Sequence, residues 1–302
     1  MTGQLTVLDT PSLWYRAFHG IPDSVVSPRG EPVNALRGTI DMVARLITDT
    51  RPARLVACLD ADWRPAFRVA AVPSYKLHRT REGGAEDEPP ALGPQVRALL
   101  EVFAALGIAV LGWAGFEADD VIGTLVTREP GPVDVVTGDR DLLQLVRAQG
   151  PVQVLYTVEK MRAYDEAAVA AKYAIPGTLY ADYACLRGDP SDGLPGVKGV
   201  GDKTAAALVS QFGSVEQIVA ALDAGGQDGF PAGSRAKLEA ARDYLRLAPA
   251  VSRLVRDLPL PTLADVLPLT AQDPAALGAL SERWGLDRPL ERLLAALALP
   301  RG

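Results

Sequence analysis

Short apolar stretches alternate with stretches of helical periodicity through residues 4–156, and this alternation constrains the fold more than any other feature of the chain. The apolar stretches predict strands at residues 4–8, 54–59, 108–111, 133–137 and 152–156. Helical spacing predicts helices at residues 34–50, 95–106, 118–128 and 142–147. Because strands that alternate with helices form parallel sheets, we predict an α/β fold with a doubly wound, mostly parallel sheet. After residue 165 the pattern becomes helical, which predicts a second region.

Acidic residues stand where the predicted strands end or where the next helix begins. They are Asp9, Asp60, Glu117, Asp119, Asp120, Asp139 and Asp141, and two more follow in the helical part, Asp189 and Asp192. A single acid at such a place is usually a helix cap or a turn residue. The carboxyl ends of parallel strands, however, meet at one edge of the sheet, where ligands bind. We therefore expect these carboxylates to converge.

Nine converging carboxylates would need cations, because neighbouring like charges raise each other's pKa strongly. The chain has two histidines and two cysteines, Cys58 and Cys185, with no CxxC spacing, which argues against a zinc site. Oxygen ligands alone favour Mg²⁺ or Mn²⁺. So many acids suggest two ions, as in the hydrolysis of phosphodiesters. Each of these acids is thus a candidate metal ligand.

Charge and composition agree with a polyanionic substrate. The formal net charge is −6, and it becomes +3 without the nine candidate metal ligands. The rest of the surface is therefore mildly basic, and nucleic acid is not excluded. The chain contains no run of 18 apolar residues and no basic-then-apolar leader. We expect a cytoplasmic protein without contact to a membrane.

A glycine-rich stretch at residues 195–205, PGVKGVGDKTA, opens an Ala-rich helix that continues to Phe212. Glycines at such a helix start let backbone N–H groups approach a phosphate, and lysines add charge. The alternative is an ordinary turn between two helices. We favour a helix–hairpin–helix type of DNA contact that positions a duplex without reading its sequence. The candidate contacts are Gly196, Lys198, Gly199, Gly201 and Lys203.

Basic residues beside aromatic ones introduce a charged segment at residues 74–94, which we expect to be mobile. Such pairs suit single-stranded nucleic acid, although a solvated basic loop has the same composition. The candidate contacts here are Arg68, Tyr75, Lys76 and Arg79. Arg16 lies close to Asp9 in the sequence and is a further candidate phosphate contact.

Six stretches of the sequence, in this order, resemble the bacterial flap endonuclease or 5′ nuclease family, which includes the N-terminal domain of bacterial DNA polymerase I. They are LDTPSLWYRAF, ACLDADWRPAFR, PSYKLHR, GFEADDVIGTL, VVTGDRDLLQLV and LRGDPSDGLPGVKGVGDKTA. The resemblance covers residues 5–260 or so. It implies a PIN-like nuclease domain at residues 1–178 with a helical arch near 73–94. It also implies a helical DNA-binding region at 179–302, with a helix–three-turn–helix motif near 186–212.

The resemblance also implies roles for individual residues. One metal ion would be held by Asp9, Asp60, Glu117 and Asp119, and a second by Asp139, Asp141, Asp189 and Asp192, with Asp120 beside them. Lys76 and Arg79 would be catalytic at the base of the arch, where Lys76 steers the scissile phosphate. Tyr75 would stack on a base. The ions would be Mg²⁺ or Mn²⁺, with a monovalent cation at the loop 195–201.

The activity implied is that of a 5′→3′ exonuclease and structure-specific flap endonuclease. Its substrates would be DNA with 5′ flaps, nicks or 5′ ends, with primer RNA at a 5′ end as a further possibility. The resemblance implies a stand-alone monomer linked functionally to DNA polymerase and ligase in replication and repair. Two alternatives remain open at this point: a DNA-structure-binding protein without catalysis, and a PIN-type ribonuclease.

Overall fold

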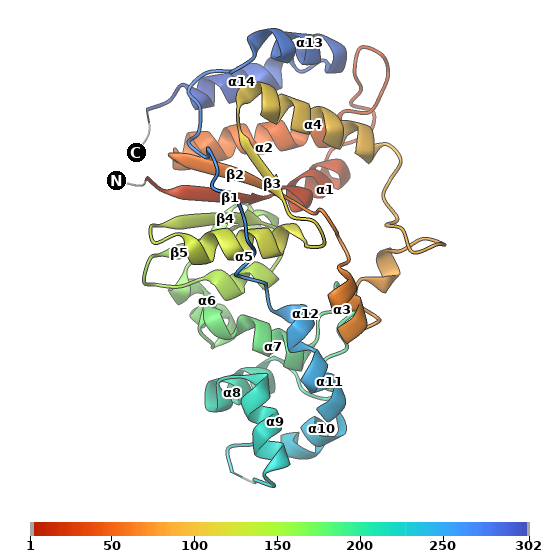
Figure 1. Ribbon diagram of the computed structural model, residues 1–302, viewed down its shortest axis with the longest axis vertical. Coiled ribbons are helices and arrows are strands. Elements are labelled where there is room, and N and C mark those ends of the chain that lie inside the picture. The colour runs from red at the N-terminus through yellow and green to blue at the C-terminus, as the bar shows by residue number, and fades with distance from the viewer. Residues whose placement is uncertain (1–2, 227, 301–302) are drawn as a thin grey trace.

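The computed structural model describes residues 3–226 and 228–300, and its centre is a six-stranded sheet with the order β3-β2-β1-β4-β5-β6 (Figure 1). The strands are β1 (Leu5–Asp9), β2 (Arg54–Leu59), β3 (Ala109–Gly112), β4 (Val133–Thr137), β5 (Val152–Tyr156) and β6 (Arg162–Tyr164). The first five run parallel, and β6 pairs antiparallel with β5. The predicted sheet is thus confirmed. Strand β6 was missed because it is short and two of its three residues are exposed.

The strands are nearly continuous apolar runs because both faces of the sheet are covered. Val7 and Val56 point into one core, which contains the helices α5 and α7, while Leu8 and Leu55 point into the other, under α2 and α4. This division follows the alternation of side chains along a strand. The helices that cover the sheet or follow it to residue 187 are α1 (Thr10–Gly20), α2 (Asn34–Thr50), α3 (Ala66–Ala71), α4 (Leu92–Leu106), α5 (Ala118–Arg128), α6 (Glu166–Tyr173) and α7 (Tyr180–Arg187).

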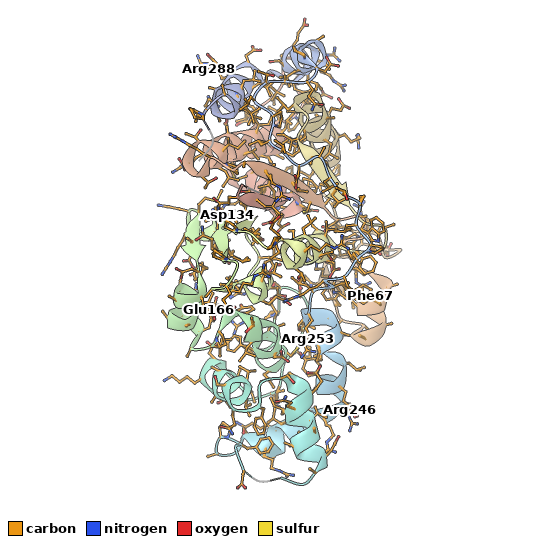
Figure 2. All side chains as sticks on the ribbon, turned by 60° about the vertical axis from the view of Figure 1, so that its left-hand side comes forward. Phe67, Asp134, Glu166, Arg246, Arg253 and Arg288 are labelled. Carbon is orange, nitrogen blue, oxygen red and sulfur yellow. The ribbon has the colours of Figure 1, made fainter. Side chains whose placement is uncertain are left out.

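Short helices form a lobe below the sheet in Figure 1. They are α8 (Asp202–Phe212), α9 (Val215–Asp223), α10 (Ser234–Ala240), α11 (Arg242–Leu247) and α12 (Pro249–Ser252). At the exit from this lobe, Arg253, labelled in Figure 2, donates to Asp182 of α7 and to Glu216 of α9, each at 2.6 Å. These ion pairs tie the chain that leaves the lobe to helices on both sides of it.

The last two helices leave the lobe. Helices α13 (Pro274–Trp284) and α14 (Asp287–Leu297) pack on α4 and α2, at the opposite end of the molecule from α8–α11 (Figure 1). Leu290 and Leu293 enter the same core as Ile40 and Ile47. We had grouped residues 179–302 into one helical region, but α13 and α14 pack on the sheet domain instead. The reason is that the apolar face of α14 is covered by the apolar face of α2.

Two further expectations on local structure were wrong. Residues 142–147 do not form an α-helix but the 3-10 helix η2 (Asp141–Leu145). Between residues 73 and 91 the chain has no α-helix: it makes the 3-10 helix η1 (Leu77–Arg79) and then a hairpin, in which Thr80 pairs with Glu86. The glycines 83 and 84 at its tip have φ of +91° and +82°, which favours a turn over a helix. The expected helical arch is therefore a hairpin here.

Two other 3-10 helices, η3 (Thr157–Glu159) and η4 (Gly177–Leu179), connect the elements after β5 and after α6.

No single helix in the described residues is long and apolar enough to cross a membrane, and α8 with α9 passes that test only as a bent pair, on length and composition.

Candidate active site

A cavity of about 560 Å³ opens at the carboxyl edge of the sheet. The strands β2, β1 and β4 are neighbours, so the residues at or just after their ends are neighbours too. Five of the nine predicted acids line this cavity: Asp9, Asp60, Glu117, Asp119 and Asp139. The convergence predicted from the order of strands and acids is thus present for these five. Lys76 and Arg79 line the same cavity.

Asp9 and Asp139 are held by hydroxyl and backbone groups. Asp9 ends β1 and caps α1, where its carboxylate accepts hydrogen bonds from the backbone N–H of Ser12 (3.2 Å) and from the hydroxyl of Thr137 (2.5 Å). Asp139 accepts a hydrogen bond from the backbone N–H of Asp141 at 2.9 Å. None of these donors carries a positive charge, so this half of the site holds its acids in place without neutralising them.

Asp60 and Glu117 lie on the other half of the site. Asp60 accepts a hydrogen bond from the backbone N–H of Ala118, at the first turn of α5 (2.7 Å). Glu117 is the N-cap of that helix and accepts hydrogen bonds from Tyr75 Oη (2.8 Å) and Arg68 Nη1 (2.5 Å). It also forms an ion pair with the ammonium group of Lys76. Three donors therefore hold the Glu117 carboxylate.

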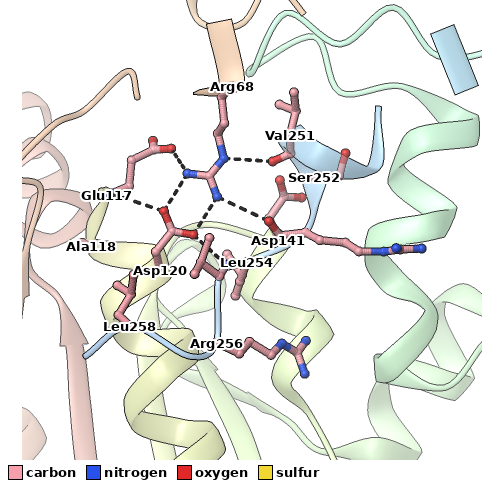
Figure 3. Close-up of polar contacts among 12 residues, drawn as sticks. Arg68, Glu117, Ala118, Asp120, Asp141, Val251, Ser252, Leu254, Arg256 and Leu258 are labelled. Carbon is pink, nitrogen blue, oxygen red and sulfur yellow. Dashed lines mark hydrogen bonds and ion pairs between the residues drawn. The ribbon is translucent and has the colours of Figure 1, made fainter. Parts of the chain in front are cut away.

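Arg68 and Asp120 do not have the roles that we expected for them. Arg68 is 2% exposed and its guanidinium donates to both oxygens of Asp120, at 2.7 and 2.8 Å (Figure 3). Asp120 is fully buried and also accepts from the backbone N–H of Val255 at 2.9 Å. Arg68 is thus closed off from a nucleic acid, and Asp120 is bound to Arg68 and is absent from the cavity wall.

The prediction that Tyr75 stacks on a base is also wrong for this structure. The ring is 3% exposed and packs with Val72, Leu194 and Val251, while its hydroxyl donates to Glu117. A tyrosine that precedes a lysine in a basic segment carries no sequence signal for burial. The burial comes from residues far along the chain.

Asp189 and Asp192 lie in the turn that follows α7. Asp189 accepts from the backbone N–H of Ser191 (2.9 Å), and its carboxylate is 3.9 Å from Arg140 Nη2. Asp192 forms an ion pair with Arg79 at 3.2 Å. This turn is close to the base of the hairpin, since Lys76 donates its backbone N–H to the carbonyl of Asp192 (3.0 Å). Both acids are buried beside the site, outside the wall of the cavity.

Burial and mutual repulsion raise the pKa values of the acids without cationic partners. Burial, and then the neighbours Asp60 and Asp139, raise the pKa of Asp9 to about 7. Burial followed by the charges of Asp9 and Asp139 raises the pKa of Asp119 well above its usual value. For Asp141 the same effect comes from burial and then from Asp139 and Asp192. The protein alone therefore disfavours full ionisation of this half of the site.

The residues of this cluster fit a hard divalent cation. The donors are all carboxylate oxygens, which suit Mg²⁺ or Mn²⁺. One oxygen of Asp141, Oδ1, is buried and has no hydrogen-bond partner. A bound ion would give this buried oxygen the partner that it lacks. In the described part of the chain, no three potential ligands already stand in coordination geometry, so an ion would draw the carboxylates closer.

The candidate DNA contacts outside the cavity are on the surface. Arg16 is exposed on α1, beside Tyr15 and His19. In the glycine-rich loop, Lys198, Gly199, Gly201 and Lys203 are exposed, and the helix that follows, α8, ends at Phe212 as predicted. The fifth predicted contact, Gly196, is half-buried: it has φ of +65°, and a Cβ there would lie 2.5 Å from the backbone nitrogen of Gly188. This glycine is thus required by close packing on the end of α7.

Sequence reasoning missed residues that shape the site. The hydroxyl of Thr137 and the backbone N–H of Ser12 orient Asp9, and Asp9 as N-cap with Pro11 in the first turn is a capping signal that could have been used. Lys237 of α10 donates to the carbonyl of Gly199 at 2.9 Å and adds a positive charge beside the loop. Nothing local in the sequence connects residues 237 and 199. Tyr15 donates to Glu86 of the hairpin at 2.8 Å across the mouth of the cavity.

Comparison with known families covers most of the chain. Residues 4–174 match the model described as "5′-3′ exonuclease, N-terminal resolvase-like domain", and residues 175–275 match "5′-3′ exonuclease, C-terminal SAM fold". The chain belongs to the 5′-3′ exonuclease family. A 5′-3′ exonuclease of Streptomyces coelicolor is 52% identical, with 96% of this chain and 99% of that protein covered.

Two further relatives show how widely this family fold is shared. DNA polymerase I of Mycobacterium bovis is 40% identical over 89% of this chain and 29% of its own length. The bacteriophage T5 D15 flap endonuclease, solved as a pseudo-enzyme-product complex with DNA and metal ions, has a TM-score of 0.64. It is 17% identical, with 97% of this chain and 98% of that chain covered, so the likeness concerns the fold. The predicted PIN-like α/β class with a helical C-terminal part is confirmed.

Proposed function

We propose that the chain is a divalent-metal-dependent 5′ nuclease, a 5′→3′ exonuclease and flap endonuclease that hydrolyses DNA phosphodiesters. One observation carries the proposal: five carboxylates from four separate places in the chain line one cavity, together with Lys76 and Arg79. Membership of the 5′-3′ exonuclease family supports the direction of attack. The fold shared with the T5 flap endonuclease supports activity on flaps.

The acids divide into two candidate ligand groups. Asp9, Asp60, Glu117 and Asp119 would hold one Mg²⁺ or Mn²⁺ ion. A second would be held by Asp139, Asp141, Asp189 and Asp192. When bound, a pair of such ions activates the attacking water and stabilises the leaving oxygen. Asp120 is left out of both groups because Arg68 already occupies both of its oxygens.

The basic residues bind and orient the DNA. Lys76 forms an ion pair with Glu117 in this structure, and its ammonium group would become available to a phosphate if Glu117 held a divalent ion. Arg79 is 41% exposed on its side-chain atoms, and it can reach a second phosphate by leaving Asp192. Both residues therefore act at the rim, where the substrate meets the acids.

The glycine-rich loop would hold the duplex away from the cavity. Its exposed glycines offer backbone N–H groups, and Lys198 and Lys203 add charge at the start of α8. Such contacts position a duplex without reading bases. We keep the helix–three-turn–helix motif at residues 186–212, the nuclease domain at 1–178 and a monovalent cation at the loop 195–201 as parts of this proposal.

The biological role follows from the substrate. An enzyme that removes 5′ flaps and 5′ ends leaves nicks, which are substrates for ligation, and it acts after strand displacement by a polymerase. The 40% identity to part of a DNA polymerase I supports this link to replication and repair. We propose that the chain works as a monomer.

The test uses the purified full chain and a DNA flap labelled at its 5′ end. We expect cleavage with Mg²⁺ or Mn²⁺ and none with EDTA. Release of single nucleotides identifies the exonuclease, and release of the intact flap identifies the endonuclease. A matched RNA flap that is cut faster than DNA would replace the proposal by the PIN-type ribonuclease. A gel shift of flap DNA without any product would replace it by the non-catalytic binder.

A further inference from the structure

Several charged groups in the described part of the chain contact a candidate metal ligand. Among them, the guanidinium of Arg68 makes the most hydrogen bonds. Its Nε donates to the carbonyl of Val251 at 3.1 Å, and Nη2 donates to the carbonyl of Arg253 at 3.4 Å. Its remaining bonds go to Glu117 and Asp120. All three nitrogens are thus engaged, and Figure 3 shows the group surrounded by these partners.

These bonds join three segments that are distant in the sequence. Arg68 belongs to α3, which follows β2; Glu117 and Asp120 form the first turn of α5; and residues 251–253 are the exit from the helical lobe. The Arg68–Val251 bond spans 183 residues of sequence. The orientation of Glu117 is therefore connected, through one side chain, to the way in which the helical lobe seats on the sheet domain.

We propose that Arg68 is a positioning residue, which holds Glu117 toward the cavity and couples this acid to the exit of the helical lobe. The charge of Arg68 is matched by Asp120, so that Asp120 serves as the partner of Arg68 and not as a ligand. This inference rests on the proposed function, because it assigns Glu117 to the metal-binding wall. Arg68 acts only through Glu117.

The geometry distinguishes this role from a DNA contact. A phosphate cannot reach a side chain that is 2% exposed and whose donors are already taken. The bidentate arrangement with Asp120 needs the planar fork of arginine, which lysine lacks. Partners that orient a metal ligand typically change metal affinity by about 10–100-fold when they are replaced. Arg68→Lys keeps the charge but loses the fork, so it tests positioning directly.

The experiment is a titration of the DNA-free full chain with Mn²⁺, followed by calorimetry, for the wild type, Arg68→Lys and a control. The control is Arg54→Lys: Arg54 is a partly buried arginine that also forms a bidentate pair with a carboxylate (Asp265, through Nε and Nη2), but it lies at the opposite end of β2 from Asp60. We expect Arg68→Lys to bind Mn²⁺ about 10–100-fold more weakly and Arg54→Lys to bind like the wild type. Equal affinity for all three proteins would overturn the role of Arg68.

Asp120 is tested by a double-mutant cycle in the same titration. If Asp120 acts only by holding Arg68, Arg68→Gln/Asp120→Asn binds Mn²⁺ no more weakly than Arg68→Gln, because the second change removes nothing further. The double variant leaves no unpaired charge at this buried position, so we expect it to fold even if Arg68→Gln alone does not. If Arg68→Gln does not fold, the affinity of the double variant is compared with that of Arg68→Lys. If the double variant loses much more Mn²⁺ affinity than Arg68→Gln and Asp120→Asn each lose alone, Asp120 is a ligand and its assignment here is overturned.

DNA binding distinguishes the two possible roles of Arg68, positioning of Glu117 and direct contact with DNA. Flap DNA binding is measured without divalent ions, in EDTA, over a range of salt. We expect the salt slope of Arg68→Lys and of the double variant to equal that of the wild type. A slope lowered by about 0.9 in the double variant, the value for one lost phosphate contact, would return Arg68 to the DNA contacts. A wild type that binds no Mn²⁺ would overturn the metal-dependent function itself, and this role with it.

Discussion

The two halves of the acidic site differ in what compensates their charge. On one half, Glu117 and Asp120 are bound by Arg68 and, for Glu117, by Tyr75 and Lys76 as well. On the other half, Asp9 and Asp139 receive only hydroxyl and backbone donors. On the first half, Glu117 and Asp120 are thus neutralised and oriented by the protein, whereas Asp60 receives only a backbone donor. The second half stays electrostatically incomplete, and under the proposed function cations would complete it.

The loss of an acid from the incomplete half should have the largest effect on catalysis. Asp119→Asn removes a cavity-wall carboxylate, and metal ions supply several kcal/mol of transition-state stabilisation. We expect flap cleavage to fall on the order of 1000-fold, which corresponds to about 4 kcal/mol. The measurement is single-turnover cleavage with saturating Mg²⁺, with Arg54→Lys as the control. Turnover near that of the wild type would show that Asp119 is not needed.

Removing one acid from each half should change the free energy of unfolding in opposite directions. Asp120→Asn leaves the buried charge of Arg68 without half of its compensation, and breaking a buried pair typically costs about 3–5 kcal/mol. Asp119→Asn instead removes a carboxylate whose pKa is raised by burial and then by repulsion from Asp9 and Asp139, so the metal-free protein keeps or gains stability. Denaturant unfolding in EDTA measures both variants. If both variants lose the same free energy, the difference between the halves does not exist.

Without metal, the incomplete half should make the protein more stable at pH 6 than at pH 8. The pKa of Asp9 is about 7 in the folded protein, above its ordinary value of 3.8. Below pH 7 the folded form therefore holds a proton that the unfolded chain has released, and stability is lost as the pH rises through 7. Below pH 7 the slope is roughly 1.4 kcal/mol per pH unit for one such group, and it levels off above pH 7, where both states are ionised.

This pH dependence is checked by thermal unfolding in EDTA between pH 5.5 and 8. Asp9→Asn is the matched variant, and we expect it to flatten the profile. Saturating Mn²⁺ should also flatten it, because the ion favours the ionised carboxylates. A melting temperature that is lower at pH 6 than at pH 8 in EDTA would contradict the assignment.

The smallest effect concerns residues outside both halves. Lys203→Ala removes an exposed charge at the start of α8. We expect flap binding to weaken and the salt slope to fall by about 0.9, while cleavage of bound substrate is unchanged. Binding titrations and single-turnover rates separate the two. A large drop in the single-turnover rate would mean that the loop also orients the reacting phosphate.

Much of the fold could be predicted because its signals are local. The helices α2 and α5 have the predicted boundaries, and the strands β1, β2, β4 and β5 are where the apolar runs are. The edge that holds Asp9, Asp60 and Asp139 follows from parallel strand order. The packing of α14 on α2 was not predictable in this way, because it depends on a surface that another element provides. The hairpin at residues 80–86 does have a local signal, the glycines 83 and 84 at its tip.

The sequence by itself determined which chemistry is present: apolar strands that alternate with helices, with carboxylates at their ends and almost no histidine. Only the tertiary structure decided which carboxylates face a cavity and which are already paired. Arg68 and Tyr75 read as DNA contacts in the sequence, yet α5 and residues 251–255 enclose them. The reason is that desolvation and charge pairing depend on groups brought together from distant parts of the chain, and no local pattern encodes them.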